Sequence, residues 1–147
     1  MVCLGNICRS PLAHGILESK LPKDLFYVDS AGTANYHVGD SPDHRSIAVA
    51  KSNGIDISNK RCRQFKVSDF DTFDYIYAMD QSNFENIIKL ARTTDDIAKV
   101  KLILEVHSSI KDKRVPDPYY GDISDFKHVY ALLDQACSLV SKTLIHK

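Results

Sequence analysis

The stretch that decides the fold lies at the N-terminus and reads Val2-Cys3-Leu4-Gly5-Asn6-Ile7-Cys8-Arg9-Ser10-Pro11. Five residues separate Cys3 from Arg9, in a loop that leaves a short apolar strand and runs into a helix. Gly5 can adopt backbone angles closed to other residues, and Asn6 tolerates left-handed geometry better than most. Such a loop can turn successive N–H groups inward around an oxyanion, with the positive end of the next helix aimed at the same point. The sequence therefore predicts a phosphate-binding loop after the first strand.

Three side chains of this loop suit phosphate chemistry. Arg9 can grip two phosphate oxygens with its planar fork. Cationic neighbours and helix N-termini favour a thiolate, so we expect Cys3 to ionise readily and to act as a nucleophile. Ser10 can donate its hydroxyl to the sulfur before attack and when the sulfur leaves. A lone Cys-x5-Arg pair is common by chance, but the full string between strand and helix is much more specific.

Outward from the loop, the chain reads as alternating strand and helix. We expect strands at residues 1–3, 25–28, 75–79 and 100–104, and helices at 11–20, 43–53, 82–90 and 124–144. Gly54 stands where a C-cap glycine would end the second helix. Strands separated by helices imply parallel pairing with right-handed crossovers. The prediction is an α/β three-layer sandwich, with a small parallel sheet of about four strands flanked by helices. Ligands of such folds bind beyond the carboxyl ends of the strands, where the strand order reverses.

The bulk properties fit one domain over residues 1–147. The chain is 44% hydrophobic, and its 19 basic residues balance its 19 acidic ones. We therefore expect neither nucleic acid nor an anionic membrane as a partner. No run approaches the ~20 apolar residues that span a bilayer, and no signal-peptide pattern is visible. The four cysteines do not make a disulfide scaffold, which favours reduced thiols and a cytoplasmic location. The histidines make no metal-ligand spacing with them, so we expect no metal and no cofactor.

The run Asp117-Pro118-Tyr119-Tyr120 completes the predicted chemistry. A phenolate departs from phosphate faster if its oxygen is protonated. Pro118 forces Asp117 toward an extended backbone on a long loop after the fourth strand. We expect Asp117 to be the general acid, and then the base that activates water. Tyr119 and Tyr120 are predicted to form a deep aromatic slot that admits phosphotyrosine, whereas phosphoserine would be too short to reach the sulfur.

These stretches resemble the low-molecular-weight protein tyrosine phosphatases over nearly the whole chain. Residues 2–11 match the family's phosphate-binding loop, 29–33 and 39–45 its second conserved stretch, 73–76 and 79–83 its third, and 117–120 its late acid motif. The resemblance implies a phosphotyrosine phosphatase with Cys3 as nucleophile, Arg9 as clamp and Asp117 as acid. It implies that substrate is bound by Leu4, Gly5, Asn6, Ile7, Cys8, Ser10, Tyr119 and Tyr120, with Tyr36 as the opposite wall. Phosphotyrosine-containing proteins would be the partners, with a tyrosine kinase as one candidate, and a monomer is expected.

The resemblance also bears on other residues. In the family, the counterparts of Cys3 and Cys8 can form a reversible disulfide that protects the nucleophile from over-oxidation. Cys62 and Cys137 are expected to pack in or near the core. Asp80 closes the third strand near the predicted site and could orient neighbouring side chains there, but an aspartate before a helix is usually a cap, which is the expected main role. Asp43 and Arg45 are expected to be structural rather than catalytic.

The sequence departs from the family's pattern in two places. Only Met1 and Val2 precede Cys3, whereas relatives carry a longer, central strand there. We therefore expect either a native upstream segment that would raise stability and activity, or a stunted middle strand. Many relatives also have a histidine where Lys60 stands, which supports the asparagine of the loop. That supporting contact is in doubt here.

Three alternatives remain at this point. Thioredoxin-coupled arsenate reductases share the fold and the loop, but need two further cysteines on a mobile segment, for which Cys62 and Cys137 are badly placed. Phosphoarginine phosphatases typically have threonine where this chain has Ile7, and they lack the paired tyrosines. A non-catalytic phosphotyrosine-binding module would normally have lost the cysteine or the acid, and both are present.

Overall fold

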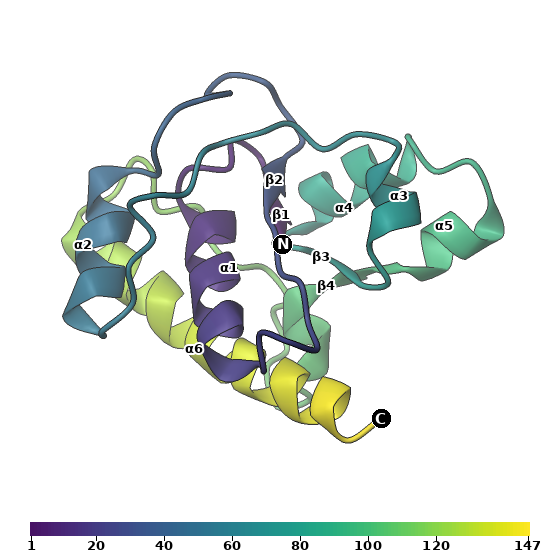
Figure 1. Cartoon of the computed structure of the whole chain (residues 1–147). Coiled ribbons are helices and arrows are strands. Elements are labelled where there is room, and N and C mark those ends of the chain that lie inside the picture. Colours follow the sequence, from purple (N-terminus) through teal and green to yellow (C-terminus); the bar gives the residue numbers. More distant parts are fainter.

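The computed structural model describes all residues from 1 to 147, and its elements are drawn in Figure 1. The four strands are β1 (Val2–Cys3), β2 (Ala31–Gly32), β3 (Ile76–Ala78) and β4 (Val100–Leu102). The helices are α1 (Arg9–Lys20), α2 (His44–Ser52), α3 (Asp69–Thr72), α4 (Gln81–Ile88), α5 (Thr94–Ala98) and α6 (Ile123–Ile145), with a 3-10 helix, η1 (Ile103–Val106).

The strands form one parallel sheet in the order β2-β1-β3-β4. The chain therefore moves from β1 to one neighbour and then returns to the other side of β1. The strand order reverses at the carboxyl end of β1, which is where such folds bind their ligands. The loop of residues 4–8 leaves the sheet at this reversal and leads into α1. The predicted position of the loop is confirmed.

Helices cover both faces of the sheet, as Figure 1 shows, with α1, α2 and α6 on one side and α3, α4 and α5 on the other. The larger core has 17 buried residues, among them Leu12 and Ile16 of α1 and Leu133 of α6. The smaller core has 8, including Phe70 of α3 and Ile87 of α4. The predicted three-layer α/β sandwich with a four-stranded parallel sheet is confirmed.

The prediction of the second strand was wrong. Residues 25–28 form no strand, because the N–H groups of Leu25 and Phe26 both turn back to the carbonyl of Pro22. The strand is the pair Ala31–Gly32 instead. A Cβ on Gly32 would lie 2.7 Å from the carbonyl oxygen of Leu4, so only glycine lets β2 approach the phosphate-binding loop this closely.

The helix predictions hold to within about two residues at each end, although three short elements were missed. The first helix starts at Arg9 rather than Pro11, which puts Arg9 and Ser10 in its first turn. Gly54 follows α2 with φ of 80°, the left-handed C-cap expected there. The short helices α3 and α5 were not predicted, and η1 occupies residues predicted as the end of the fourth strand.

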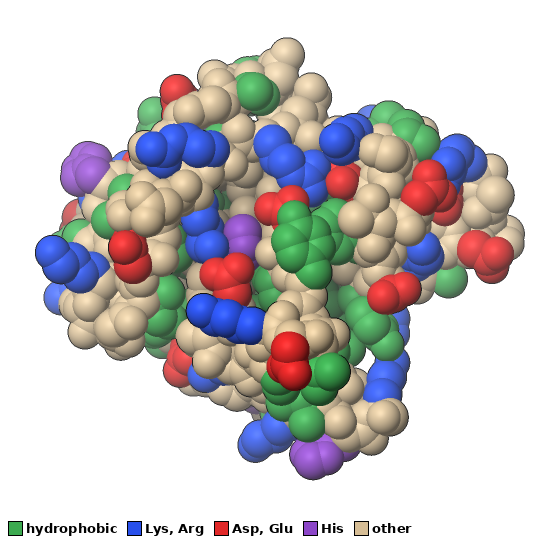
Figure 2. Space-filling model, viewed as in Figure 1, with side chains coloured by type: hydrophobic (Ala, Val, Ile, Leu, Met, Phe, Trp, Pro, Cys, Tyr) green, Lys and Arg blue, Asp and Glu red, His purple; other side chains and the backbone are tan.

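Charges of both signs are mixed on the surface. Figure 2 shows Lys and Arg side chains interspersed with Asp and Glu over the visible face, in keeping with a net charge of zero. None of the helices has the length and apolar character that crossing a membrane would require.

Candidate active site

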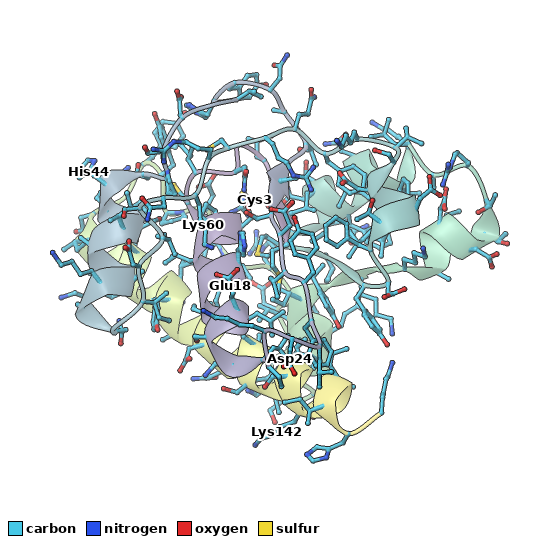
Figure 3. The ribbon with its side chains drawn as sticks, in the orientation of Figure 1. Cys3, Glu18, Asp24, His44, Lys60 and Lys142 are labelled. Atoms are coloured by element: carbon cyan, nitrogen blue, oxygen red, sulfur yellow. The ribbon has the colours of Figure 1, made fainter.

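The thiol of Cys3 lies at the carboxyl end of β1, at the base of the loop (Figure 3). Its Sγ accepts a hydrogen bond from the N–H of Asn6 (3.3 Å) and lies 3.1 Å from Oγ of Ser10. Nδ2 of Asn6 donates to the same Oγ (2.7 Å), so the hydroxyl proton of Ser10 is left to point elsewhere. The other acceptor within reach, the carbonyl of Ala31, is farther away at 3.4 Å. The geometry therefore favours a Ser10 hydroxyl that donates to sulfur.

The turn of the loop is made by Asn6 rather than Gly5. Asn6 has φ of 59°, and no other non-glycine residue has a positive φ. Its Oδ1 accepts from the N–H of Arg63 (3.0 Å), and its carbonyl accepts from the thiol of Cys62 (2.8 Å). Gly5, predicted to supply the unusual backbone angles, is not in the left-handed region. Glycine is favoured at this position because a Cβ there would lie 3.1 Å from the ring of His37.

Arg9 is buried and oriented by two partners. Its Nη1 donates to Oδ2 of Asp80 (2.7 Å) and to the carbonyl of Val115 (3.1 Å). Its Nε and Nη2 make no hydrogen bond within the protein, so one edge of the fork is available for two oxygens of a ligand. Burial by itself would lower the pKa of Arg9, but Cys3, Asp80 and Asp117 raise it above its ordinary value. The guanidinium therefore stays charged.

Asp80 does more than the sequence indicated. Its Oδ1 caps α4 by accepting from the N–H of Asn83 (2.8 Å), as predicted, while its Oδ2 holds Arg9. The two contacts use different oxygens of one carboxylate. The second contact joins residues that are 71 positions apart in the chain, and no local sequence signal indicates it.

Asp117 lies across the pocket from the loop. Its Oδ2 is 3.8 Å from Nη2 of Arg9, and its Oδ1 accepts from the N–H of Tyr119 (3.1 Å). The side chain is 42% exposed, so water can reach it. A carboxyl group placed here could meet the oxygen that leaves a phosphate bound by Arg9.

One cavity of about 290 Å³ brings most of the predicted residues together. Its lining consists of Cys3, Leu4, Gly5, Ile7, Cys8, Arg9, Tyr36, His37, Asp117, Tyr119 and Tyr120. The predicted Asn6 and Ser10 are buried behind this lining and contact the thiol from there. Tyr119 and Tyr120 meet edge to face with ring centroids 4.9 Å apart. Tyr36 and Tyr120 are 72% and 94% exposed, so they form the mouth rather than the depth of the cavity. His37, which was not predicted, also borders it.

Lys60 does not replace the supporting histidine of relatives. Its Nζ donates to Oε1 of Glu18 (2.9 Å) and lies 3.3 Å from Nε2 of His14. Figure 3 shows Lys60 and Glu18 beside α1. His14 in turn bonds Ser30 through Nδ1 (2.9 Å). The oxygen of Asn6 is bound by the backbone of Arg63 instead, so the doubtful contact is replaced.

Comparison with known proteins gives the family. Residues 1–147 match the family described as low molecular weight phosphotyrosine protein phosphatase. The chain belongs to this family. The low molecular weight phosphotyrosine protein phosphatase of Dictyostelium discoideum is 46% identical over 145 residues, which cover 85% of this chain and 80% of that protein. The human enzyme of the same name is 40% identical over 144 residues, which cover 92% of this chain and 88% of the human protein.

Solved structures agree with this assignment. A protein tyrosine phosphatase from Entamoeba histolytica, with Hepes in its active site, superposes with a TM-score of 0.93 at 36% identity, covering 99% of this chain and 94% of that one. Vibrio vulnificus Wzb, in complex with benzylphosphonate, superposes with a TM-score of 0.86 at 31% identity. The match covers 97% of this chain and 94% of that one. The predicted family is confirmed, and a low molecular weight protein tyrosine phosphatase is an enzyme, a hydrolase that acts on phosphotyrosine.

Proposed function

We propose that the protein hydrolyses phosphotyrosine through a phospho-cysteine intermediate on Cys3. In the first step the Cys3 thiolate attacks phosphorus, the bond from phosphorus to the phenolic oxygen breaks, and Asp117 gives that oxygen a proton. Arg9 binds two of the remaining phosphate oxygens with Nε and Nη2, the edge of its fork that makes no hydrogen bond within the protein. The observation that carries the proposal is that a single cavity is lined by Cys3, Arg9 and Asp117.

In the second step Asp117, now ionised, takes a proton from water as that water attacks phosphorus. The bond from phosphorus to sulfur breaks, inorganic phosphate forms, and Cys3 leaves as a thiolate. The Ser10 hydroxyl, 3.1 Å from sulfur, stabilises the charge that returns to it. The transition state of such transfers is loose, so positioning and charge supply most of the rate.

We propose that the aromatic mouth selects an aryl phosphate. Tyr36, Tyr119 and Tyr120 border the cavity, and Ile7 and Leu4 line it with apolar surface. The relative Wzb from Vibrio vulnificus binds benzylphosphonate, in which a methylene group joins the phosphonate to a benzene ring. That complex supports an aryl phosphate as the substrate class here. The predicted substrate-binding residues Gly5, Asn6, Cys8 and Ser10 would surround the phosphate itself.

The alternatives have less support. An arsenate reductase of this fold needs two mobile cysteines, but Cys62 donates to the loop carbonyl of Asn6, and Cys137 is fully buried in α6. Burial raises the pKa of Cys62 to about 11 and that of Cys137 to about 12, so both thiols resist ionisation. Ile7 disfavours phosphoarginine, as the sequence indicated. The presence of Cys3 and Asp117 disfavours a non-catalytic module.

Five further expectations stay proposals. We expect residues 1–147 to act as one domain, as a monomer, in the cytoplasm. Phosphotyrosine-containing proteins would be its partners, among them a tyrosine kinase as one candidate.

Cys3 and Cys8 both border the cavity, and burial raises the pKa of Cys8, so Cys3 would be the thiol that oxidant attacks first. Mild peroxide should then cause a loss of activity that dithiothreitol restores in the wild type but not in Cys8→Ala.

One assay tests the proposed reaction. Turnover of p-nitrophenyl phosphate, a phosphotyrosine peptide and a phosphoarginine peptide is measured for wild type, Cys3→Ser and Asp117→Ala. We expect Cys3→Ser to be inactive and Asp117→Ala to lose roughly 10²–10⁴-fold, the usual contribution of a general acid. Phosphoarginine should be the poorer peptide. Activity that survives in Cys3→Ser, or a preference for phosphoarginine, would contradict the proposal.

A further inference from the structure

Arg45, on the first turn of α2, holds the segment that carries Asp117. Its Nη2 donates to the carbonyl of Tyr119 (3.0 Å) and its Nη1 to the carbonyl of Gly121 (3.1 Å). These are the only hydrogen bonds that reach residues 116–121 from any other part of the chain. The guanidinium also lies 4.4 Å from the ring centroid of Phe126, at the start of α6.

The same turn of α2 is fastened to the phosphate-binding loop. The N–H of Asp43 donates to the carbonyl of Ile7 (2.8 Å), and Oγ of Ser46 donates to the carbonyl of Cys8 (3.2 Å). Arg45 is locked to Asp43 by two bonds, from Nε (3.0 Å) and from Nη2 (2.9 Å). A continuous set of contacts therefore runs from the loop, through Asp43 and Arg45, to the acid segment.

The Asp43–Arg45 pair is built to stay charged. The Asp43 side chain is only 8% exposed. Burial alone would raise the pKa of its carboxyl, but the hydrogen bonds from Arg45 hold that pKa below its ordinary value. The bond to Asp43 likewise raises the pKa of Arg45. A planar fork that serves a carboxylate and two carbonyls at once is a task for arginine, which lysine cannot perform with one ammonium group.

We propose that Arg45 is a positioning residue for the reaction, setting the place of Asp117 relative to Cys3. This inference rests on the proposed role of Asp117 as general acid. Asp117 has few other constraints, since its Oδ1 is bonded only within its own segment and Arg9 must engage the phosphate. Without Arg45, the backbone at Tyr119 and Gly121 would be free to shift the carboxyl away from the leaving oxygen. Misplacement by about 1 Å can cost about 10²-fold in rate.

The dependence on the leaving group tests this role. A poor leaving group needs its proton in the transition state more than a good one does. We therefore expect Arg45→Met to lower kcat/KM roughly 10–100-fold for phenyl phosphate, but only a few-fold for p-nitrophenyl phosphate. The parameter kcat/KM covers the steps up to phosphate transfer to Cys3, where the acid acts. Because Met leaves the Asp43 carboxylate without its partner, Arg45→Lys, which keeps the charge, is measured alongside and should lie in between.

Two comparisons separate positioning from mere stability. Arg92 also bridges two carboxylates, those of Asp71 and Asp96, far from the cavity. Arg92→Met is the matched control, and it should leave the leaving-group dependence unchanged. In an Asp117→Ala background, Arg45→Met should cost little further activity, since the group it positions is gone.

The outcomes are distinguishable. A loss in Arg45→Met that is equal for both substrates, or that persists in full in the Asp117→Ala background, overturns this inference and leaves the proposed reaction intact. If Asp117→Ala itself keeps wild-type activity on phenyl phosphate, the proposed acid fails and the inference fails with it.

Discussion

The two halves of the cavity proposed as the active site are built in opposite ways. In the phosphate-binding loop, Asn6, Arg9 and Ser10 are each almost fully buried and hydrogen-bonded within the protein. The acid segment, residues 116–121, is mostly exposed, and hydrogen bonds from a single side chain, Arg45, tie it to the rest of the chain.

This difference follows from what each half must do. A loop that stabilises charge must be preorganised, because donors that have to reorient cost free energy at the moment of reaction. An acid must instead meet a departing group, admit water afterwards and let product leave, so a partly exposed position suits it. We therefore expect substitutions in the loop to disturb several buried hydrogen bonds at once, and substitutions in the acid segment, other than at Asp117 itself, to have smaller and separable effects.

Apart from Cys3 and Asp117 themselves, the largest effect is expected at Arg9. Lysine at this position can still pair with Asp80, so Arg9→Lys should fold, but it lacks the second edge that would bind two phosphate oxygens. We expect kcat/KM for p-nitrophenyl phosphate to fall by roughly 10²–10³-fold, the range seen when one preorganised donor is removed. Arg92→Lys, on the surface, should retain full activity. Near-normal turnover in Arg9→Lys would mean that a point charge suffices and that the buried orientation of the loop arginine has little value.

A second effect concerns a buried histidine of α1. His14 is buried among Ser30, Lys60 and Glu18. Burial, together with the positive charge of Lys60, lowers its pKa from 6.5 to about 4. Between these values the unfolded chain binds a proton that the folded protein does not, so stability falls as the pH drops through this window. At about 1.36 kcal/mol per pH unit, the full loss is up to about 3 kcal/mol.

Urea unfolding at pH 7.5 and pH 5.0 measures the part of this loss that falls between pH 6.5 and pH 5.0, about 2 kcal/mol. His14→Gln should be less sensitive to pH over this range than the wild type, whereas His128→Gln, which changes an exposed histidine, should behave like the wild type. Carboxyl groups with lowered pKa, such as that of Asp43, titrate below this window and do not obscure it. If His14→Gln and the wild type lost the same stability, another group would have to carry the pH dependence.

The contrast between the two halves also explains what the sequence could predict. The loop is local, since Cys3, Asn6, Arg9 and Ser10 fall within eight residues, and their chemistry is visible from their spacing. The helices and the topology followed from periodicity and alternation. The second strand did not, because Ala31–Gly32 is chosen by the space beside the loop and not by strand propensity.

The contacts that escaped prediction are those between distant residues. Asp80 was identified as a cap, but its bond to Arg9 spans 71 positions, and the bond from Arg45 to Tyr119 spans 74. Cys62 was expected near the core, yet its thiol also donates to the loop. His37 reaches the cavity because it packs against Gly5. Each of these residues has an ordinary local role, so only the folded chain reveals the second one.

A smaller effect at Asn6 sharpens the account of the loop. Asn6→Ala and Asn6→Gly remove the same contacts to Ser10 and Arg63, but only alanine is strained at φ of 59°. We expect Asn6→Ala to be about 1 kcal/mol less stable than Asn6→Gly in urea unfolding. Both should lose a similar factor in turnover, since both leave the Ser10 hydroxyl without its donor. Equal stability would show that the loop relaxes to another backbone conformation and is less fixed than its hydrogen bonds suggest.

The smallest effect should come from Tyr120, in the acid segment. Its ring is 94% exposed and contacts Tyr119 edge to face, an aromatic pair worth about 0.5–1.5 kcal/mol at most. Tyr120→Ala should therefore barely change stability, while it raises KM for a phosphotyrosine peptide a few-fold with kcat preserved. Tyr27, which is 72% exposed and stacks on Phe73 away from the cavity, is the matched control.

Whether Tyr120→Ala changes KM alone or kcat as well shows if this ring helps to hold the acid segment. If Tyr120 only borders the mouth, its loss weakens binding of the peptide and leaves the chemical step unchanged, so KM alone responds. If kcat fell as well, the ring would be helping to hold Asp117, and the hydrogen bonds from Arg45 would not be the main restraint on the acid segment. Because Tyr27→Ala removes a similar exposed aromatic pair, an equal rise in KM there would point to a general loss of structure instead.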